Sequence, residues 1–156
     1  MELLDRLKVR PQVRTAMQWC LGFWPDDEVA KLYQAADVNL FATCAEGFGL
    51  PIIEAGACGV PSIVTDWGPA AEVVGEGGIK VPVAVKPWRM EPMRWMVYPD
   101  PGGLFRAMVR LHDDAALRAE LGQKALENAR EYDSEKITQW WSWYLQGRPK
   151  AELKAA

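Results

Sequence analysis

The stretch that decides the fold runs from residue 38 to residue 65 and reads VNLFATCAEGFGLPIIEAGACGVPSIVT. Residues 38–43 and Ser62–Thr65 are short, mainly apolar runs of the kind found in buried strands. Residues 51–58 between them suit a helix, because proline favours the first helical position and Gly59 favours the end. A strand, a helix and a strand in this order predict parallel strands joined by a right-handed crossover.

The same alternation continues on both sides of this stretch. Further strands are expected at residues 17–21 and 79–83, and a helix is expected after Pro25 with Tyr33 on its apolar face. Residues 85–96 are expected to form a long irregular loop, followed by three more helices. The last helix is expected to be capped by Ser134 and to have an inner face made of Ile137, Trp140, Trp141, Tyr144 and Leu145.

The predicted fold class is therefore α/β, a Rossmann-like parallel sheet with flanking helices. We expect one domain over residues 1–146 and a polar tail over residues 147–156. Ligands of such sheets bind at the carboxyl ends of the strands, where the loops after Thr43, Thr65 and Val83 would meet.

The composition argues against several classes of function. The chain has 156 residues and a net charge of −3, with no block of like charge that would indicate a nucleic-acid partner. No segment resembles a signal peptide or a membrane span, so a cytoplasmic location without membrane association is expected. The single histidine, His112, is interpreted as decoration of a helix C-terminus, and no metal site is expected. The three cysteines are interpreted as buried free thiols: Cys20, Cys44 and Cys58.

The loop from Glu46 to Glu54 contains the candidate chemistry. Gly47 and Gly49 allow the backbone to bend sharply and to approach a ligand closely. The helix that starts at Pro51 presents unpaired N–H groups and the positive end of its dipole, which suit a diphosphate. The two carboxylates suit sugar hydroxyls, which they bind through charge-assisted hydrogen bonds. These features predict a site for a nucleoside-diphosphate sugar, with hexose and ribose on either side of the diphosphate.

This loop resembles the signature of the group 1 (family 4) retaining glycosyltransferases, which have the two-domain GT-B fold. Glu46 and Glu54 are eight positions apart with Gly-Phe-Gly-Leu between them, and residues 32–38, 54–61 and 68–75 resemble the segments that flank this signature. The chain is similar to the C-terminal, donor-nucleotide-binding half of that fold, from about residue 13 to residue 83 and again from Pro99.

The resemblance implies roles for individual residues. Glu46 would contact the hydroxyls of the donor sugar and is the candidate catalytic residue, and Glu54 would bind the ribose hydroxyls. Residues 22–24 would lie near the base. The remaining donor-binding residues, whose backbone would approach the sugar and the diphosphate, are Gly47, Phe48, Gly49 and Leu50. The resemblance also implies sugar transfer with retention, without a metal or other cofactor, in which the leaving phosphate helps to deprotonate the acceptor.

The chain departs from the family at its start. The family's nucleotide domain begins with two strands and a glycine-containing loop with phosphate-binding cations, and neither these nor the acceptor domain has a counterpart here. The missing strands would be central, which would leave backbone groups without partners. We therefore expect a homo-oligomer or a complex with a separately encoded N-terminal half. Direct pairing of the strands at residues 17–21 and 38–43 is the alternative.

Two further interpretations stay open. Arg89 and Arg94 are candidate phosphate contacts that would replace the missing cations, although residues 85–96 could instead form a tryptophan-anchored loop over the core. The chain could also be a module that binds a nucleotide sugar and transfers nothing. For the glutamates, the simpler alternatives are that Glu46 caps its own loop and that Glu54 is a solvated helix residue. A dinucleotide-dependent oxidoreductase is excluded, because Ile52 occupies the position of the third glycine in Gly-x-Gly-x-x-Gly.

Overall fold

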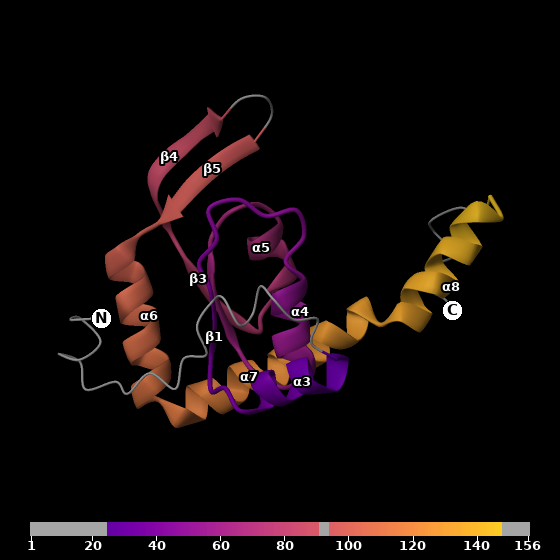
Figure 1. The fold of residues 1–156 in the computed structure, drawn as a ribbon, viewed down its shortest axis with the longest axis horizontal. Coiled ribbons are helices and arrows are strands. Elements are labelled where there is room, and N and C mark those ends of the chain that lie inside the picture. Colours follow the sequence, from indigo (N-terminus) through magenta and orange to yellow (C-terminus); the bar gives the residue numbers. More distant parts are fainter. Residues whose placement is uncertain (1–24, 91–93, 148–156) are drawn as a thin grey trace.

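The computed structural model describes residues 25–90 and 94–147, without the side chains of residues 85–90, 94 and 95 (Figure 1). The strand expected at residues 17–21 and the loop at residues 22–24 lie outside the described residues. The elements follow in the order α3 (Asp26–Gln34), β1 (Asn39–Phe41), α4 (Leu50–Ala57), β2 (Ser62–Thr65), α5 (Gly68–Val73), β3 (Gly78–Val81), β4 (Val83–Met90), β5 (Arg94–Pro99), α6 (Pro101–Asp113), α7 (Ala115–Ala129), the 3-10 turn η1 (Arg130–Tyr132) and α8 (Ser134–Leu145).

Three parallel strands form the main sheet, in the order β1-β2-β3. All four residues of the middle strand, β2, are buried, because helices cover both faces of the sheet. Val64 packs on one face with residues of α4 and α5, and Ile63 packs on the other with residues of α6 and α7. Both side chains are fully buried, which stabilises the fold by about 1.5–3 kcal/mol for each residue. The predicted α/β, Rossmann-like class is confirmed.

Two glycines allow α4 and α7 to pack closely. A Cβ atom at Gly56 would lie 2.9 Å from the backbone oxygen of Ala125, and one at Gly122 would overlap the backbone oxygen of Gly59. Without a side chain at these positions the two helices approach backbone to backbone. This contact fixes α4, whose first turn begins at the carboxyl edge of the sheet (Figure 1).

The expectation of an irregular loop over residues 85–96 is wrong. β4 and β5 pair as an antiparallel hairpin that extends beyond the carboxyl edge of the parallel sheet (Figure 1). The amide of Val97 donates to the carbonyl of Cys44 at 2.9 Å, which joins the hairpin to the loop after β1. A proline within a run argues against a strand, and Pro87 lies within β4. The structure accommodates Pro87 through a register shift between Val85 and Trp88.

Two expectations for the last helix are also wrong. Asp133 rather than Ser134 is the N-cap, and its carboxylate accepts from the amide of Glu135 at 2.8 Å. The expected inner face is not buried, since Trp141 is 50% exposed and Tyr144 is 56% exposed. The helix extends away from the domain (Figure 1), so its apolar face packs mainly on itself through ring contacts between Trp140, Trp141 and Tyr144.

Candidate functional site

The loop between β1 and α4 lies at the carboxyl edge of the sheet, as expected for a ligand site in a parallel α/β fold. Two contacts hold it in place. The hydroxyl of Thr65, at the end of β2, donates to the carbonyl of Thr43 at 3.0 Å. The amide of Val97, in the hairpin, donates to the next carbonyl, that of Cys44. Both neighbours of the loop therefore fix its first residues relative to the sheet.

The turn into α4 depends on glycine and proline. Gly49 is the N-cap with φ 102°, in the left-handed region that side chains rarely adopt, and a Cβ atom there would lie 3.0 Å from the Ile52 side chain. Pro51 lies in the first turn, where its missing N–H costs nothing. The amide of Ile52 donates to the carbonyl of Gly49 at 2.9 Å, which closes the turn. The reasoning from the sequence is thus confirmed for Gly49 and Pro51, whereas Gly47 is not among the glycines with positive φ.

Glu46 caps its own loop in this structure. Its Oε1 atom accepts from the amide of Gly47 at 2.8 Å and lies 3.4 Å from the amide of Phe48. These amides belong to the group that the family resemblance assigns to the donor. In the described part of the chain, the amides of Gly49 and Leu50 have no acceptor. The loop thus already holds one anionic oxygen, which is supplied by the protein itself.

Glu54 lies on the exposed side of α4, where its Oε2 atom accepts a hydrogen bond from the hydroxyl of Tyr33 at 3.0 Å. Tyr33 comes from the last turn of α3. Burial, followed by the hydrogen bond and the negative charge of Glu54, raises the pKa of Tyr33 well above its usual value of 10.0. The phenol therefore stays protonated and remains a donor to Glu54 throughout the ordinary pH range.

Glu54 and Cys58, one turn apart on α4, both face α3. Burial and the charge of Glu54 raise the pKa of the Cys58 thiol, and its sulfur lies 3.8 Å from the carbonyl of Ala30. Cys44 and Cys58 are both free thiols in the structure. The thiol of Cys58 therefore belongs to the contact between α3 and α4.

Phe48 links the loop to the start of the C-terminal segment. Its ring is 44% exposed and makes an edge-to-face contact with Tyr132 of η1, with ring centres 5.8 Å apart. Such a contact adds about 0.5–1.5 kcal/mol beyond the area that it buries. Sequence reasoning assigned only a backbone role to Phe48 and missed both Tyr33 and Tyr132. Their partners are distant in sequence, and no local pattern indicates them.

The candidate phosphate contacts lie near the far end of the hairpin. In its register Arg89 pairs with Trp95 and Arg94 pairs with Met90, and their side chains are outside what the structure describes. Any contact that these two arginines make with phosphate stays a prediction. The question matters, because the sequence has no lysine or arginine between Lys31 and Lys80. The loop and α4 therefore contain no cation of their own.

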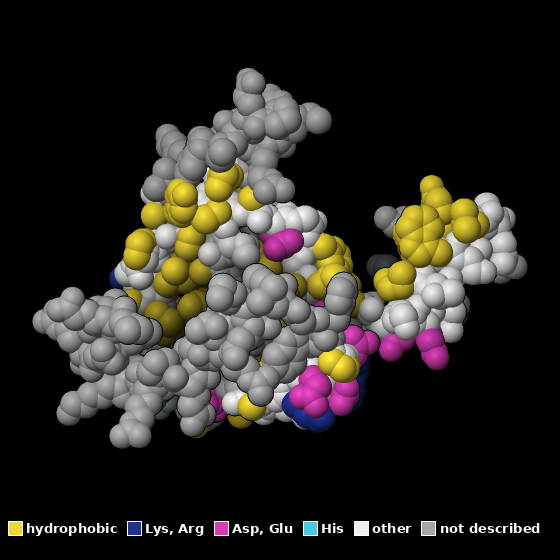
Figure 2. All heavy atoms as spheres, viewed as in Figure 1, with side chains coloured by type: hydrophobic (Ala, Val, Ile, Leu, Met, Phe, Trp, Pro, Cys, Tyr) yellow, Lys and Arg dark blue, Asp and Glu magenta, His cyan; other side chains and the backbone are white. Residues whose placement is uncertain are grey.

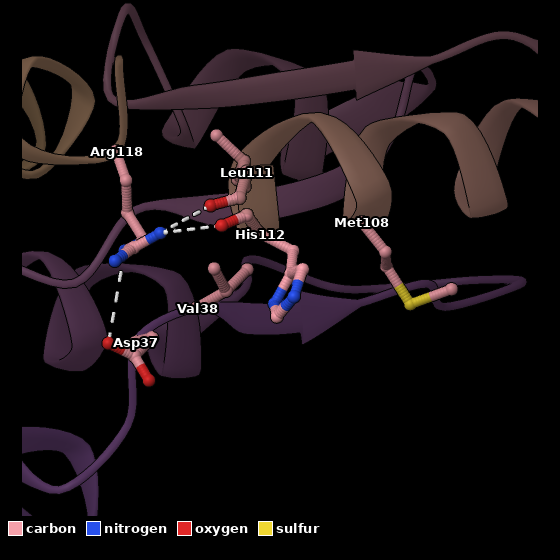
Figure 3. Close-up of a pocket in the computed structure, with 6 residues that line it drawn as sticks. All are labelled: Asp37, Val38, Met108, Leu111, His112 and Arg118. Carbon is pink, nitrogen blue, oxygen red and sulfur yellow. Dashed lines mark hydrogen bonds and ion pairs between the residues drawn. The ribbon is translucent and has the colours of Figure 1, made fainter. Parts of the chain in front are cut away.

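A cavity of about 310 Å³ lies at the opposite, amino edge of the sheet, between the start of β1 and the end of α6 (Figure 3). Arg118 donates to the carbonyls of Leu111 and His112 at 2.6 and 3.4 Å, and its Nε atom lies 3.8 Å from Asp37. Arg118 thus satisfies the last carbonyls of α6, which is a structural role. His112 lies in the last turn of that helix, as expected, and also lines the cavity.

Across the described ranges, no cluster of three or more His, Cys, Asp or Glu residues could hold a metal ion. None of the helices in those ranges combines the length and apolar character needed to cross a membrane.

The fold and the position of the loop define a class: a Rossmann-like α/β domain with a glycine-containing loop and a helix N-terminus at the carboxyl edge of its sheet. Comparison with known proteins gives the family. The chain belongs to the glycosyl transferases group 1, whose family model matches residues 13–90.

Several bacterial relatives support this assignment. The chain is 44% identical over 59 residues to the O-antigen chain mannosyltransferase B of Escherichia coli, covering 38% of this chain and 16% of that protein. It is 34% identical over 112 residues to a D-inositol 3-phosphate glycosyltransferase of Streptomyces bingchenggensis (70% of this chain, 21% of that protein). It is 33% identical over 112 residues to an N-acetyl-alpha-D-glucosaminyl L-malate synthase of Bacillus anthracis (71% and 26%). The chain thus spans 16 to 26% of the length of these relatives.

Proposed function

We propose that this chain is the donor-binding domain of a retaining glycosyltransferase that uses a nucleoside-diphosphate sugar. One observation supports the proposal most strongly: the amide of Gly47 already binds a carboxylate oxygen at 2.8 Å, with the amide of Phe48 at 3.4 Å from the same atom. Amides directed at an anionic oxygen, beside a helix N-terminus, suit the oxygens of a diphosphate. Glu54, one turn along α4, would then bind the ribose hydroxyls.

In the proposed reaction the bond between the sugar carbon C1 and the diphosphate oxygen breaks. A bond between C1 and the acceptor oxygen forms on the same face of the sugar. The acceptor proton passes to the leaving phosphate oxygen, so no protein base is required. The protein contributes orientation and electrostatic stabilisation of the leaving diphosphate. Glu46 would have to release the loop amides and turn to the donor sugar hydroxyls.

In this proposal, additional polypeptide completes the site. It comes from a second copy of the chain in a homo-oligomer or from a separately encoded N-terminal half. Among the described strands β1 pairs only with β2, and Leu40 of β1 is 49% exposed. Figure 2 shows hydrophobic side chains gathered over α6 and the base of the hairpin, where Phe105 is 64% exposed. The absence of lysine and arginine from residues 32–79 also favours phosphate cations from outside this segment. A metal-independent reaction and a cytoplasmic location are part of the proposal.

A second candidate function is a module that binds the nucleotide sugar without transferring it. The same two observations favour it: Glu46 occupies the loop amides, and the loop region has no cation of its own. Such a module would keep Glu54 and its ribose contact but would lack electrostatic support for the leaving group.

Calorimetry of the full chain with UDP, GDP, UDP-glucose and GDP-mannose tests the binding function. We expect one nucleotide to bind and Glu54→Ala to weaken it, with His112→Ala, at the opposite edge of the sheet, as the control variant. Slow hydrolysis of the bound sugar nucleotide would support the transferase, and binding without hydrolysis would support the module. Failure of the wild-type chain to bind any of the four ligands would refute donor binding by this chain alone and would favour a remnant or an obligate subunit.

A further inference from the structure

The hydrogen bond between Tyr33 and Glu54 joins two helices that are separated in the sequence. The two residues are 21 positions apart, and the phenol oxygen lies 3.0 Å from Oε2 of the carboxylate. Tyr33, in the last turn of α3, is half-buried, whereas Glu54 is exposed. A half-buried ring has little rotational freedom, so it is a fixed point from which a mobile carboxylate can be held.

The chemistry of the pair leaves Glu54 free to bind a diol. An ionised carboxylate offers about four acceptor positions on its two oxygens, and Tyr33 occupies one of them. Two neighbouring hydroxyls need two acceptor positions, which Oε1 and the remaining lone pair of Oε2 supply. The raised pKa of Tyr33 agrees with this arrangement, because it keeps the phenol protonated and so always a donor.

A free glutamate on a helix surface samples several rotamers, and binding must select one of them at a cost in entropy. A carboxylate held by Tyr33 has already lost part of that freedom. A second contact stabilises this side of α4 against α3, since the sulfur of Cys58, one turn beyond Glu54, lies 3.8 Å from the carbonyl of Ala30. The two contacts together hold α3 and α4 in a fixed relative position next to the Glu54 carboxylate.

We infer that Tyr33 is a positioning residue that orients Glu54 toward the 2′- and 3′-hydroxyls of the donor ribose, and so sets the preference for ribonucleotides over 2′-deoxyribonucleotides. The inference rests on the proposed donor-binding function and deepens it. Tyr33 acts through Glu54 and does not itself contact the nucleotide.

The test uses the full chain with UDP, GDP and their 2′-deoxy forms, and dissociation constants measured by calorimetry. Tyr33→Phe removes only the hydroxyl, and thermal unfolding checks that the variant stays folded. We expect its dissociation constant for the bound ribonucleotide to rise about threefold to tenfold, the effect of weakening one hydrogen-bonded contact. The dissociation constant for the 2′-deoxy form should change by less than about twofold, because that ligand lacks the 2′-hydroxyl that Glu54 would bind. Tyr144→Phe, on the exposed face of α8, is the matched control.

A double-mutant cycle shows whether Tyr33 acts through Glu54. In a Glu54→Ala background, Tyr33→Phe should have no further effect on either nucleotide. Equal weakening of both forms, no weakening of the ribonucleotide, or an effect that persists without Glu54 would each overturn the role of Tyr33 and leave the donor-binding function standing. A wild-type chain that binds neither UDP nor GDP would refute donor binding by this chain alone, and this inference would fail with it.

Discussion

Removing the Glu46 carboxylate should have opposite effects on two ligands of the same site. In the structure Glu46 binds the amide of Gly47 at 2.8 Å and lies 3.4 Å from that of Phe48, a distance at which little hydrogen-bond energy remains. The carboxylate therefore makes one good bond, at an exposed position, with a net value of about 1 kcal/mol. A nucleoside diphosphate that needs these amides must break that bond first. Glu46→Ala should consequently bind UDP or GDP about fivefold more tightly than the wild type.

The sugar nucleotide should respond in the other direction, because Glu46 is expected to contact the hexose hydroxyls. Glu46→Ala loses those contacts, so its affinity for the sugar nucleotide should fall below that of the wild type. The ratio of the sugar-nucleotide affinity to the diphosphate affinity should therefore fall by more than the roughly fivefold gain expected for the diphosphate alone. Glu46→Gln is the matched control, since its amide oxygen still accepts from the loop amides but carries no charge. Its affinities for both ligands should lie between those of the wild type and those of Glu46→Ala. Calorimetry with the diphosphate and its sugar conjugate measures both effects. Weaker binding of the diphosphate by Glu46→Ala would refute the competition, and so would an unchanged affinity.

Three further predictions concern the scaffold, the cations and pH. Gly56→Ala should lower the free energy of unfolding by about 1–3 kcal/mol in a denaturant titration, because its Cβ atom would meet the backbone of Ala125 at 2.9 Å; an unchanged midpoint would show that α4 and α7 separate easily. Changing Arg89 and Arg94 together to alanine should weaken nucleotide binding without moving the unfolding midpoint, and an unchanged affinity would remove both from the site. Since the folded-state pKa of Tyr33 is raised above 10.0, its contribution to stability is complete below about pH 10 and is lost as pH rises beyond that. Unfolding measured between pH 8 and pH 11 should therefore show a steeper loss for the wild type than for Tyr33→Phe, and parallel curves would contradict this.

The strand and helix order could be predicted from the sequence because its signals are local. The apolar run of β2 was predicted at its observed bounds, and α4 begins within one residue of its expected position. Glycine at the left-handed position before α4, and proline in the first turn, determine the loop backbone from the conformations open to those residues alone. The family also follows from this loop, and the family model that matches residues 13–90 agrees.

The hairpin and the contacts of the site were not predictable in this way. β4 and β5 contain Pro87 and lack regular alternation, and they are strands because each supplies the other's hydrogen-bond partners. The N-cap of α8 is Asp133 and not the expected Ser134. The choice between two adjacent polar residues depends on where the chain leaves the preceding turn, which the local sequence does not specify.

The sequence by itself determined the parallel α/β order, the conformation of the turn into α4 and the family, because each of these depends on residues within a few positions of one another. Only the tertiary structure decided that Tyr33 of α3 holds Glu54 of α4 and that Phe48 contacts Tyr132. The physical reason is the range of the interactions. Backbone propensities act between residues that are close in the sequence. The partner of the Glu54 carboxylate depends instead on how α3 packs against α4. That packing results from many contacts between residues that are far apart in the sequence.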